Sequence, residues 1–189
     1  PVNVNGNWNA WLNLGYDTPL DKSRRLTLGT TTTANYYHIV DFSGTNSLPT
    51  ALRTTTQTSV LDEELRLNYR YKKLNVGVKS STAWNHSTAN RSDFKDANTW
   101  NIRYGANVVI DLPWAFQFSS ELTMFTRRGY ESNTMNRDEL VWNARLTKSF
   151  LKNRLSLMLD AWDIQGNLSN VNVGIDSRNR WEYYTNVIP

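Results

Sequence analysis

The segment Trp100–Gly129 reads WNIRYGANVVIDLPWAFQFSSELTMFTRRG, and its two runs of alternating apolar and polar residues decide the fold. Because successive side chains of a β-strand point to opposite faces, this alternation predicts two strands, each with one apolar and one polar face. Asp111–Pro113 separates the runs and predicts a tight turn. Each run has about ten residues or more, and a strand of that length, tilted by about 45°, crosses the hydrocarbon core of a bilayer.

The same unit repeats along the whole chain and predicts about nine strands. Their expected positions are about 5–16, 25–42, a third strand ending at 71, 74–84, 100–110, 114–124, 139–150, 155–161 and a last strand from about 178. Short turns at 17–22, 72–73, 112–113 and 151–153 alternate with long loops at 43–52, 86–97, 129–138 and 164–177. Membrane β-barrels have this asymmetry, with short periplasmic turns and long outside loops.

Aromatic residues gather at both ends of the expected strands. Beside the short turns lie Tyr16, Tyr71, Trp114 and Phe150, and nearer the long loops lie Tyr36, Trp84, Trp100, Trp142 and Trp181. Amphipathic rings form two such belts at the two interfaces of a membrane. The alternative is the ordinary aromatic core of a soluble β-sheet, which the continuous apolar faces disfavour.

The amino-acid composition of the chain argues against several classes of function. The 189 residues have a formal net charge of +4 without a basic block, so nucleic acid is not an expected partner. The absence of cysteine excludes a disulfide framework and thiolate metal sites. The sequence has no apolar run long enough for a membrane helix, and it carries no catalytic motif, so neither an enzyme nor a cofactor is expected. Mean hydropathy is −0.58, a value that lumen-facing polar residues would produce in a barrel.

Three segments of the sequence, 138–150, 157–164 and 183–189, are similar to segments of a known protein family, and segments 8–20 and 127–130 are consistent with the same family. They resemble the C-terminal barrel region of Bacteroidetes outer-membrane β-barrel proteins of the TonB-dependent receptor type. The resemblance implies a protein of the Gram-negative outer membrane in which a plug domain precedes a barrel of about 22 strands. The implied partners are outer-membrane lipid, the rest of the barrel with its plug, the TonB complex through an N-terminal region, and, as a further candidate, a surface lipoprotein.

On this interpretation residues 1–189 form the C-terminal part of the barrel, without the plug and the N-terminal strands. If the long loops lie outside, the ninth strand runs toward the periplasm, which is the direction of a final barrel strand. Nine strands cannot close a barrel of even strand number. We therefore expect an all-β, antiparallel, up-and-down fragment of a transmembrane barrel that forms an open, strongly curved sheet.

The polar face supplies the first candidate site. Five residues of alternating sign lie on successive expected strands at similar heights, and they are Arg103, Glu121, Arg145, Asp160 and Arg180. One interpretation is a ladder of lumen-facing salt bridges that fixes strand register. The other is a charged track that contacts a plug or a permeating substrate, in which case neutralising Arg145 would alter transport without a folding defect.

The long loops supply the second candidate site, because ligand recognition concentrates in loops. The expected loop contacts are Tyr37, His38, Phe94, Lys95, Arg127, Arg128, Tyr130, Asn167 and Asn170. A metal site would require His38 and His86 to converge with a carboxylate such as Asp41, and two histidines that face water are the simpler interpretation.

The function expected from the sequence is the barrel wall of a TonB-dependent importer or receptor for an unidentified nutrient. The first alternative is a non-transporting outer-membrane barrel that scaffolds or anchors a surface protein complex. A soluble β-sheet binding module is the second alternative, and partitioning without detergent would distinguish it.

Overall fold

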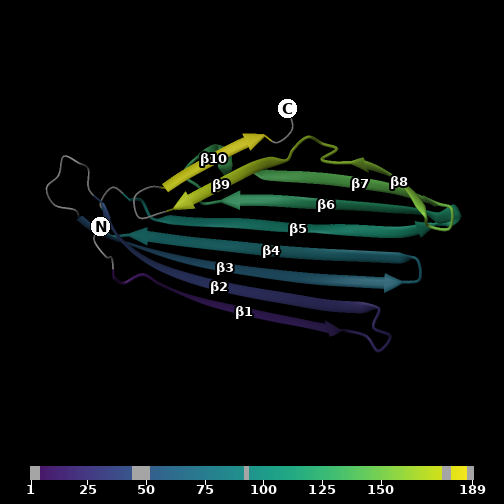
Figure 1. The fold of residues 1–189 in the computed structure, drawn as a ribbon, viewed down its shortest axis with the longest axis horizontal. Coiled ribbons are helices and arrows are strands. Elements are labelled where there is room, and N and C mark those ends of the chain that lie inside the picture. Colours follow the sequence, from purple (N-terminus) through teal and green to yellow (C-terminus); the bar gives the residue numbers. More distant parts are fainter. Residues whose placement is uncertain (1–4, 44–51, 92–93, 176–179, 187–189) are drawn as a thin grey trace.

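The computed structural model describes residues 5–43, 52–91, 94–175 and 180–186 (Figure 1). Eight antiparallel strands follow one another in one sheet, in the order of the sequence. They are β1 (Trp8–Pro19), β2 (Leu26–Ser43), β3 (Leu52–Tyr71), β4 (Leu74–Ala89), β5 (Ala97–Leu112), β6 (Phe116–Arg128), β7 (Asp138–Phe150) and β8 (Leu155–Ala161). The predicted all-β, antiparallel, up-and-down architecture is confirmed.

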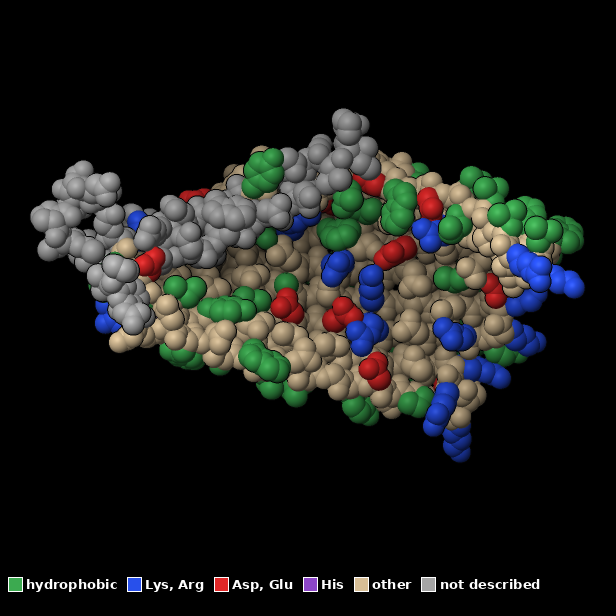
Figure 2. Space-filling view, in the orientation of Figure 1, with side chains coloured by type: hydrophobic (Ala, Val, Ile, Leu, Met, Phe, Trp, Pro, Cys, Tyr) green, Lys and Arg blue, Asp and Glu red, His purple; other side chains and the backbone are tan. Residues whose placement is uncertain are grey.

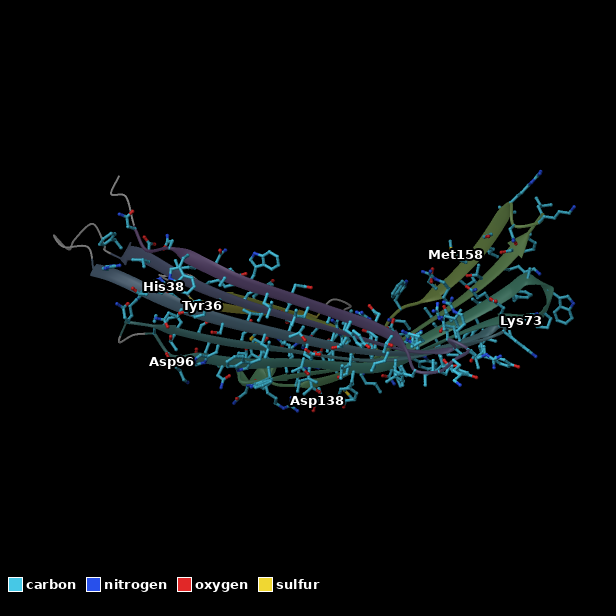
Figure 3. The ribbon with its side chains drawn as sticks, turned by 90° about the horizontal axis from the view of Figure 1, so that it is seen from below. Tyr36, His38, Lys73, Asp96, Asp138 and Met158 are labelled. Carbon is cyan, nitrogen blue, oxygen red and sulfur yellow. The ribbon has the colours of Figure 1, made fainter. Side chains whose placement is uncertain are left out.

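The sheet is open, as expected. Its order ends at β1 on one side and β8 on the other, and no ladder joins these two strands within the described part of the chain. Figure 3 shows the sheet turned on its side as a curved wall. The strands β9 (Ser169–Ile175) and β10 (Arg180–Asn186) form a second, two-stranded sheet that shares no ladder with the first among the described residues.

Tight connections join the strands at one end of the wall. Lys72–Lys73 joins β3 to β4, the short 3₁₀ turn η1 (Pro113–Ala115) joins β5 to β6, and Leu151–Arg154 joins β7 to β8. Positive φ angles at Lys72 (52°) and at Trp114 (60°) let the chain reverse within so few residues. The opposite connection of β6 to β7 is longer and contains the second 3₁₀ turn, η2 (Asn133–Met135).

Several strands are longer than the alternation predicted. β4 continues to Ala89 through residues expected in the loop 86–97, and β5 begins at Ala97 instead of about residue 100. A strand of this length extends beyond the roughly ten residues that a bilayer needs. The strands therefore continue past the apolar band toward the long connections.

The prediction that the last strand, from about residue 178, lies beside the eighth strand of the sheet is wrong. The expected loop 164–177 contains β9, and β10 pairs with β9 in antiparallel register, Arg180 opposite Ile175, instead of continuing the wall. The backbone amide of Ile164 still bonds the carbonyl of Trp142, and Asp163 has a φ of 42° where the chain leaves the sheet. A local hairpin thus replaces the predicted last strand of the wall.

The two faces of the sheet have opposite chemistry. The apolar face carries exposed large side chains, among them Trp8 (54% exposed), Leu14 (57%), Val78 (51%), Tyr104 (50%) and Leu159 (62%). The other face, called the charged face below, carries Lys, Arg, Asp and Glu side chains that gather near its centre (Figure 2). Among the residues whose burial the structure describes, the buried apolar ones are few, and they are Val40, Ala97, Tyr130, Met135 and Val141. No helix among the described residues is long and apolar enough to span a membrane.

Candidate functional site

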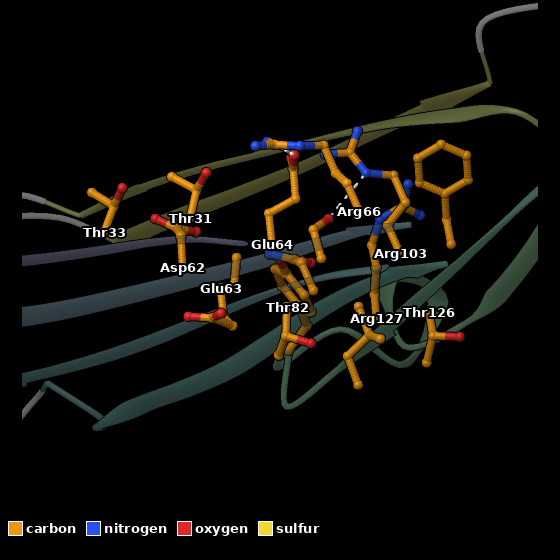
Figure 4. Close-up of a pocket in the computed structure, with 16 residues that line it drawn as sticks. Thr31, Thr33, Asp62, Glu63, Glu64, Arg66, Thr82, Arg103, Thr126 and Arg127 are labelled. Carbon is orange, nitrogen blue, oxygen red and sulfur yellow. Dashed lines mark hydrogen bonds and ion pairs between the residues drawn. The ribbon is translucent and has the colours of Figure 1, made fainter. Parts of the chain in front are cut away.

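The charged face is hollowed over the middle strands. One hollow of about 430 Å³, called the central hollow, is lined from β3 by Asp62, Glu64 and Arg66 and from β5 and β6 by Arg103, Phe125 and Arg127 (Figure 4). Its floor lies on β4, where strand register places Ala83 beside Asp62 and Ser81 beside Glu64. Small side chains on the middle strand therefore leave room between two polar walls.

The walls of the central hollow differ in charge. On β3, Arg66 pairs with Glu64 at 2.5 Å and approaches Asp17 at 3.6 Å. The carboxylate of Asp62 has no hydrogen-bond or ion-pair partner in the described chain. On β5, Arg103 donates to the Ser81 hydroxyl at 3.3 Å, and its guanidinium lies 5.9 Å from the Phe125 ring centre. The hollow thus offers an unpaired carboxylate on one wall and a guanidinium without a carboxylate partner on the other.

A buried ion cluster closes the hollow toward the long-connection end. The fully buried Glu139 carboxylate lies 3.1 Å from Arg127 Nη1 and 3.0 Å from Arg137 Nε. The Ser169 hydroxyl donates to Glu139 and accepts a 3.1 Å hydrogen bond from Arg127. Because Ser169 begins β9, this cluster fastens the C-terminal hairpin to the charged face of β6 and β7. The sequence did not single out Glu139 or Ser169.

A second hollow of about 330 Å³ lies nearer the short turns. Lys79 Nζ on β4 is 3.1 Å from Glu121 on β6, and Arg145 on β7 pairs with Asp160 on β8. All four side chains are about a third to a half exposed, so their ion pairs contribute little to stability.

The five residues of the expected charge ladder therefore fall into separate contacts. Register sets Arg103 opposite Phe125 on β6, and Glu121 finds Lys79 instead. Arg145 and Asp160 are in register and form the expected pair. Arg180 lies in β10, outside the eight-stranded sheet, and its side chain is outside the described part of the structure. The described residues therefore do not form the continuous charge ladder that was expected across the fifth to ninth strands.

The expected loop contacts are distributed over both faces and the loops. Tyr37 is exposed on the charged face of β2, whereas His38 lies on the apolar face, stacked on Trp8 at 5.8 Å with Nδ1 2.9 Å from the Gly6 carbonyl oxygen. Arg128 Nη2 donates to both carboxylate oxygens of Asp138, at 2.9 and 2.8 Å.

The remaining loop contacts serve mainly local structure. Tyr130 is buried and donates to Asn101 at 2.7 Å, and Asn167 donates to the Leu140 carbonyl at 3.1 Å. The amide of Phe94 bonds the Arg91 carbonyl, Lys95 lies 4.0 Å from Glu131, and Asn170 lies in β9 with its side chain outside the described set.

No cluster of three or more metal-ligating side chains exists among the described residues. His38 and His86 lie on β2 and β4, with β3 between them, and each stacks on a tryptophan, at 5.8 Å in both cases. What the charged face can do chemically is to hold water, polar solutes or a charged protein segment. The candidate site residues predicted from the sequence did not include Lys79, Asp62, Glu64 and Arg66, although alternation with apolar residues already indicates that they lie on this face.

Comparison with known proteins does not add a family to these observations. No protein-family model, no curated protein and no solved structure matches the chain.

Proposed function

We propose that the chain forms part of the barrel wall of a TonB-dependent outer-membrane importer for a polar nutrient. The observation that carries the proposal is the segregation of the two faces. Large apolar side chains stay exposed along one face, while ion pairs and two hollows occupy the other. A soluble protein rarely exposes so extended an apolar surface, whereas a membrane barrel needs it against lipid.

Aromatic side chains on the apolar face support the membrane placement. Trp84 and Trp100 pack at 6.1 Å near the long-connection end, and Trp8 packs on Tyr36 at 4.9 Å. At the short-turn end, Lys148 lies 4.4 Å from the Phe116 ring centre and 5.4 Å from that of Phe150. Rings and cations at strand ends suit the two interfaces of a bilayer.

The open edges and the charged face support a wall that is completed by further sequence. Strands β1 and β8 each have one unpaired edge in the described sheet, and such edges attract further strands. Asp62 and Arg103 face the concave side without ionic partners, and in a closed barrel they would meet the plug or the solute. In this role the wall contributes no covalent chemistry, and transport follows from plug movement driven by TonB.

The experiment uses the intact protein from cells, detected with an antibody against this chain. We expect it in the outer-membrane fraction, extracted only by detergent, and bound by the isolated periplasmic domain of TonB. Recovery from the soluble fraction without detergent would contradict the membrane wall and favour a soluble binding module. An outer-membrane protein without a plug and without TonB binding would favour the alternative, a non-transporting scaffold for a surface complex.

A further inference from the structure

The apolar face carries one charged side chain away from its ends. Strand register places five charged residues of the described sheet on this face. Four of them, Arg53, Arg128, Asp138 and Lys148, lie at or near strand ends, and the fifth, Glu63, lies in the interior of β3. A charge in this position of a membrane wall is costly, so it requires a physical explanation.

The level of Glu63 in the membrane follows from the aromatic belts. On β1, Leu12 lies midway between Trp8 and Tyr16, and through β2 it is in register with Leu61 on β3. The short-turn belt moves toward the turns along the sheet, since Tyr16 is in register with Leu65 whereas the aromatic residues of β3 at this end are Tyr69 and Tyr71. A strand tilt of about 40° displaces the mid-level by about 4 Å for each strand. Two strands from β1 this displacement is about two residues, which brings the mid-level from Leu61 to Glu63.

Hydroxyl groups surround Glu63 on both sides. From β2, Thr30 donates to Oε1 at 2.7 Å and Thr32 donates to Oε2. On β4, Thr82 is in register with Glu63, and Ser80 is in register with Leu65. The Ser80 and Thr82 hydroxyls have no hydrogen-bond partner within the described chain. These five residues, Thr30, Thr32, Glu63, Ser80 and Thr82, are called the polar patch below.

The polar patch is complementary to itself. It offers a carboxylate that can accept further hydrogen bonds and, one strand away, two hydroxyls that can donate them. A two-fold axis along the membrane normal between β3 and β4 would set Glu63 of each copy against Thr82 and Ser80 of the other. The same axis keeps the two carboxylates on opposite sides of the contact. Around the patch, Leu61 (42% exposed), Leu65 (48%) and Val78 (51%) supply an apolar rim.

We propose that the polar patch is the contact by which two copies of this wall associate within the membrane. The proposal rests on the proposed membrane function, because water would otherwise solvate the patch. Polar side chains hydrogen-bond between neighbouring chains where lipid offers no partner. A charge pair between copies is not available, since the described apolar face has no lysine or arginine near Glu63.

The experiment is disulfide cross-linking of the intact protein in its own outer membrane. Residues 1–189 contain no cysteine, so an introduced cysteine adds one thiol to this part of the wall, and the parent protein is the background control. Thr82→Cys lies beside the expected axis and should give a product of twice the mass under mild oxidation. Ala144→Cys is the matched control, because it lies on the same face of β7, three strands or about 14 Å from β4, and should give little product.

A second substitution tests the carboxylate. Glu63→Leu in the Thr82→Cys background removes both symmetric hydrogen-bond sets, and we expect the doubled product to fall by about tenfold, as loss of polar contacts in a membrane predicts. The fold should persist, since an apolar residue suits the lipid face, and retained heat-modifiable migration on gels would show it.

Four results would overturn the proposal. The first three are absence of the doubled product, an equal yield from Ala144→Cys, and a yield that Glu63→Leu does not change. The fourth is a Thr82→Cys product of another mass, which would show that this position contacts a different protein that carries a thiol. Failure of the membrane function itself is recognised separately, because the intact protein would then not fractionate with the outer membrane.

Discussion

The buried carboxylate of Glu139 gives the largest stability effect that we expect from one conservative substitution. Its side chain is 0% exposed and contacts Arg127, whose side chain is 11% exposed, at 3.1 Å. Glu139→Gln preserves the size of the side chain but leaves the Arg127 guanidinium buried without its counter-charge. Breaking a buried pair in this way costs about 3–5 kcal/mol. Because Ser169 is bonded to both residues, the C-terminal hairpin should loosen at the same time.

The assay is urea unfolding of the intact protein in lipid vesicles, followed by tryptophan fluorescence. Asp160→Asn is the matched control, since it breaks the Arg145 pair, whose side chains are 45% and 31% exposed. An exposed pair is worth about 0–1 kcal/mol, so the control should unfold close to the parent. The reasoning is refuted if Glu139→Gln is as stable as the parent, or if both substitutions lower the free energy of unfolding equally.

Three further predictions concern the turn, a glycine and the lipid face. Hydrogen bonds from the Ser23 hydroxyl and from the Leu26 amide at the start of β2 lower the pKa of Asp21 below its usual 3.8. The ionised Asp21 carboxylate therefore stabilises the fold fully above pH 3.8, and this stabilisation is lost as the pH falls through the lowered pKa. The difference in unfolding free energy between the parent and Asp21→Asn, measured by unfolding at a series of pH values, should vanish below the lowered pKa, and a difference that persists there would contradict the prediction. Gly129→Ala should lower the free energy of unfolding by more than about 1 kcal/mol, because φ is +82° and a Cβ would overlap a β5 carbonyl oxygen, whereas Gly15→Ala meets nothing within 4 Å and should be neutral in the same assay. Val78→Arg on the apolar face should cost about 2–4 kcal/mol in vesicles and Asn107→Arg on the charged face almost nothing, and equal costs would reverse the assignment of faces.

Alternation was sufficient to predict the eight strands of the wall and which residues share a face. Trp100 and Trp84 were expected near the same end, and register sets them opposite each other. The period of two carries this information because a shift of one residue would turn every apolar side chain to the charged face. Strand ends were predicted less well, since β4 and β5 continue through polar residues where the alternation fades.

The alternation of apolar and polar residues could not predict which charged residues pair or that the C-terminal segment forms its own hairpin. Register sets Glu121 opposite Asn107 and Arg103 opposite Phe125, and Glu121 pairs instead with Lys79 two strands away, across β5. The segment Ser169–Ile175 does alternate, with Val171, Val173 and Ile175, although the sequence analysis placed it within the long loop 164–177. Whether such a segment joins the wall or pairs locally with β10 depends on contacts such as that of Ser169 with Glu139, which no periodicity reveals.

The central claim is that the apolar face meets lipid and the charged face meets water. Ala106→Cys on β5 and Ser119→Cys on β6 place single small thiols on opposite faces at the middle of the wall. In the intact protein in its native membrane, we expect a lipid-soluble maleimide to label Ala106→Cys and a charged, membrane-impermeant thiol reagent to label Ser119→Cys. Rapid labelling of Ala106→Cys by the charged reagent, at the rate seen for Ser119→Cys, would contradict the account.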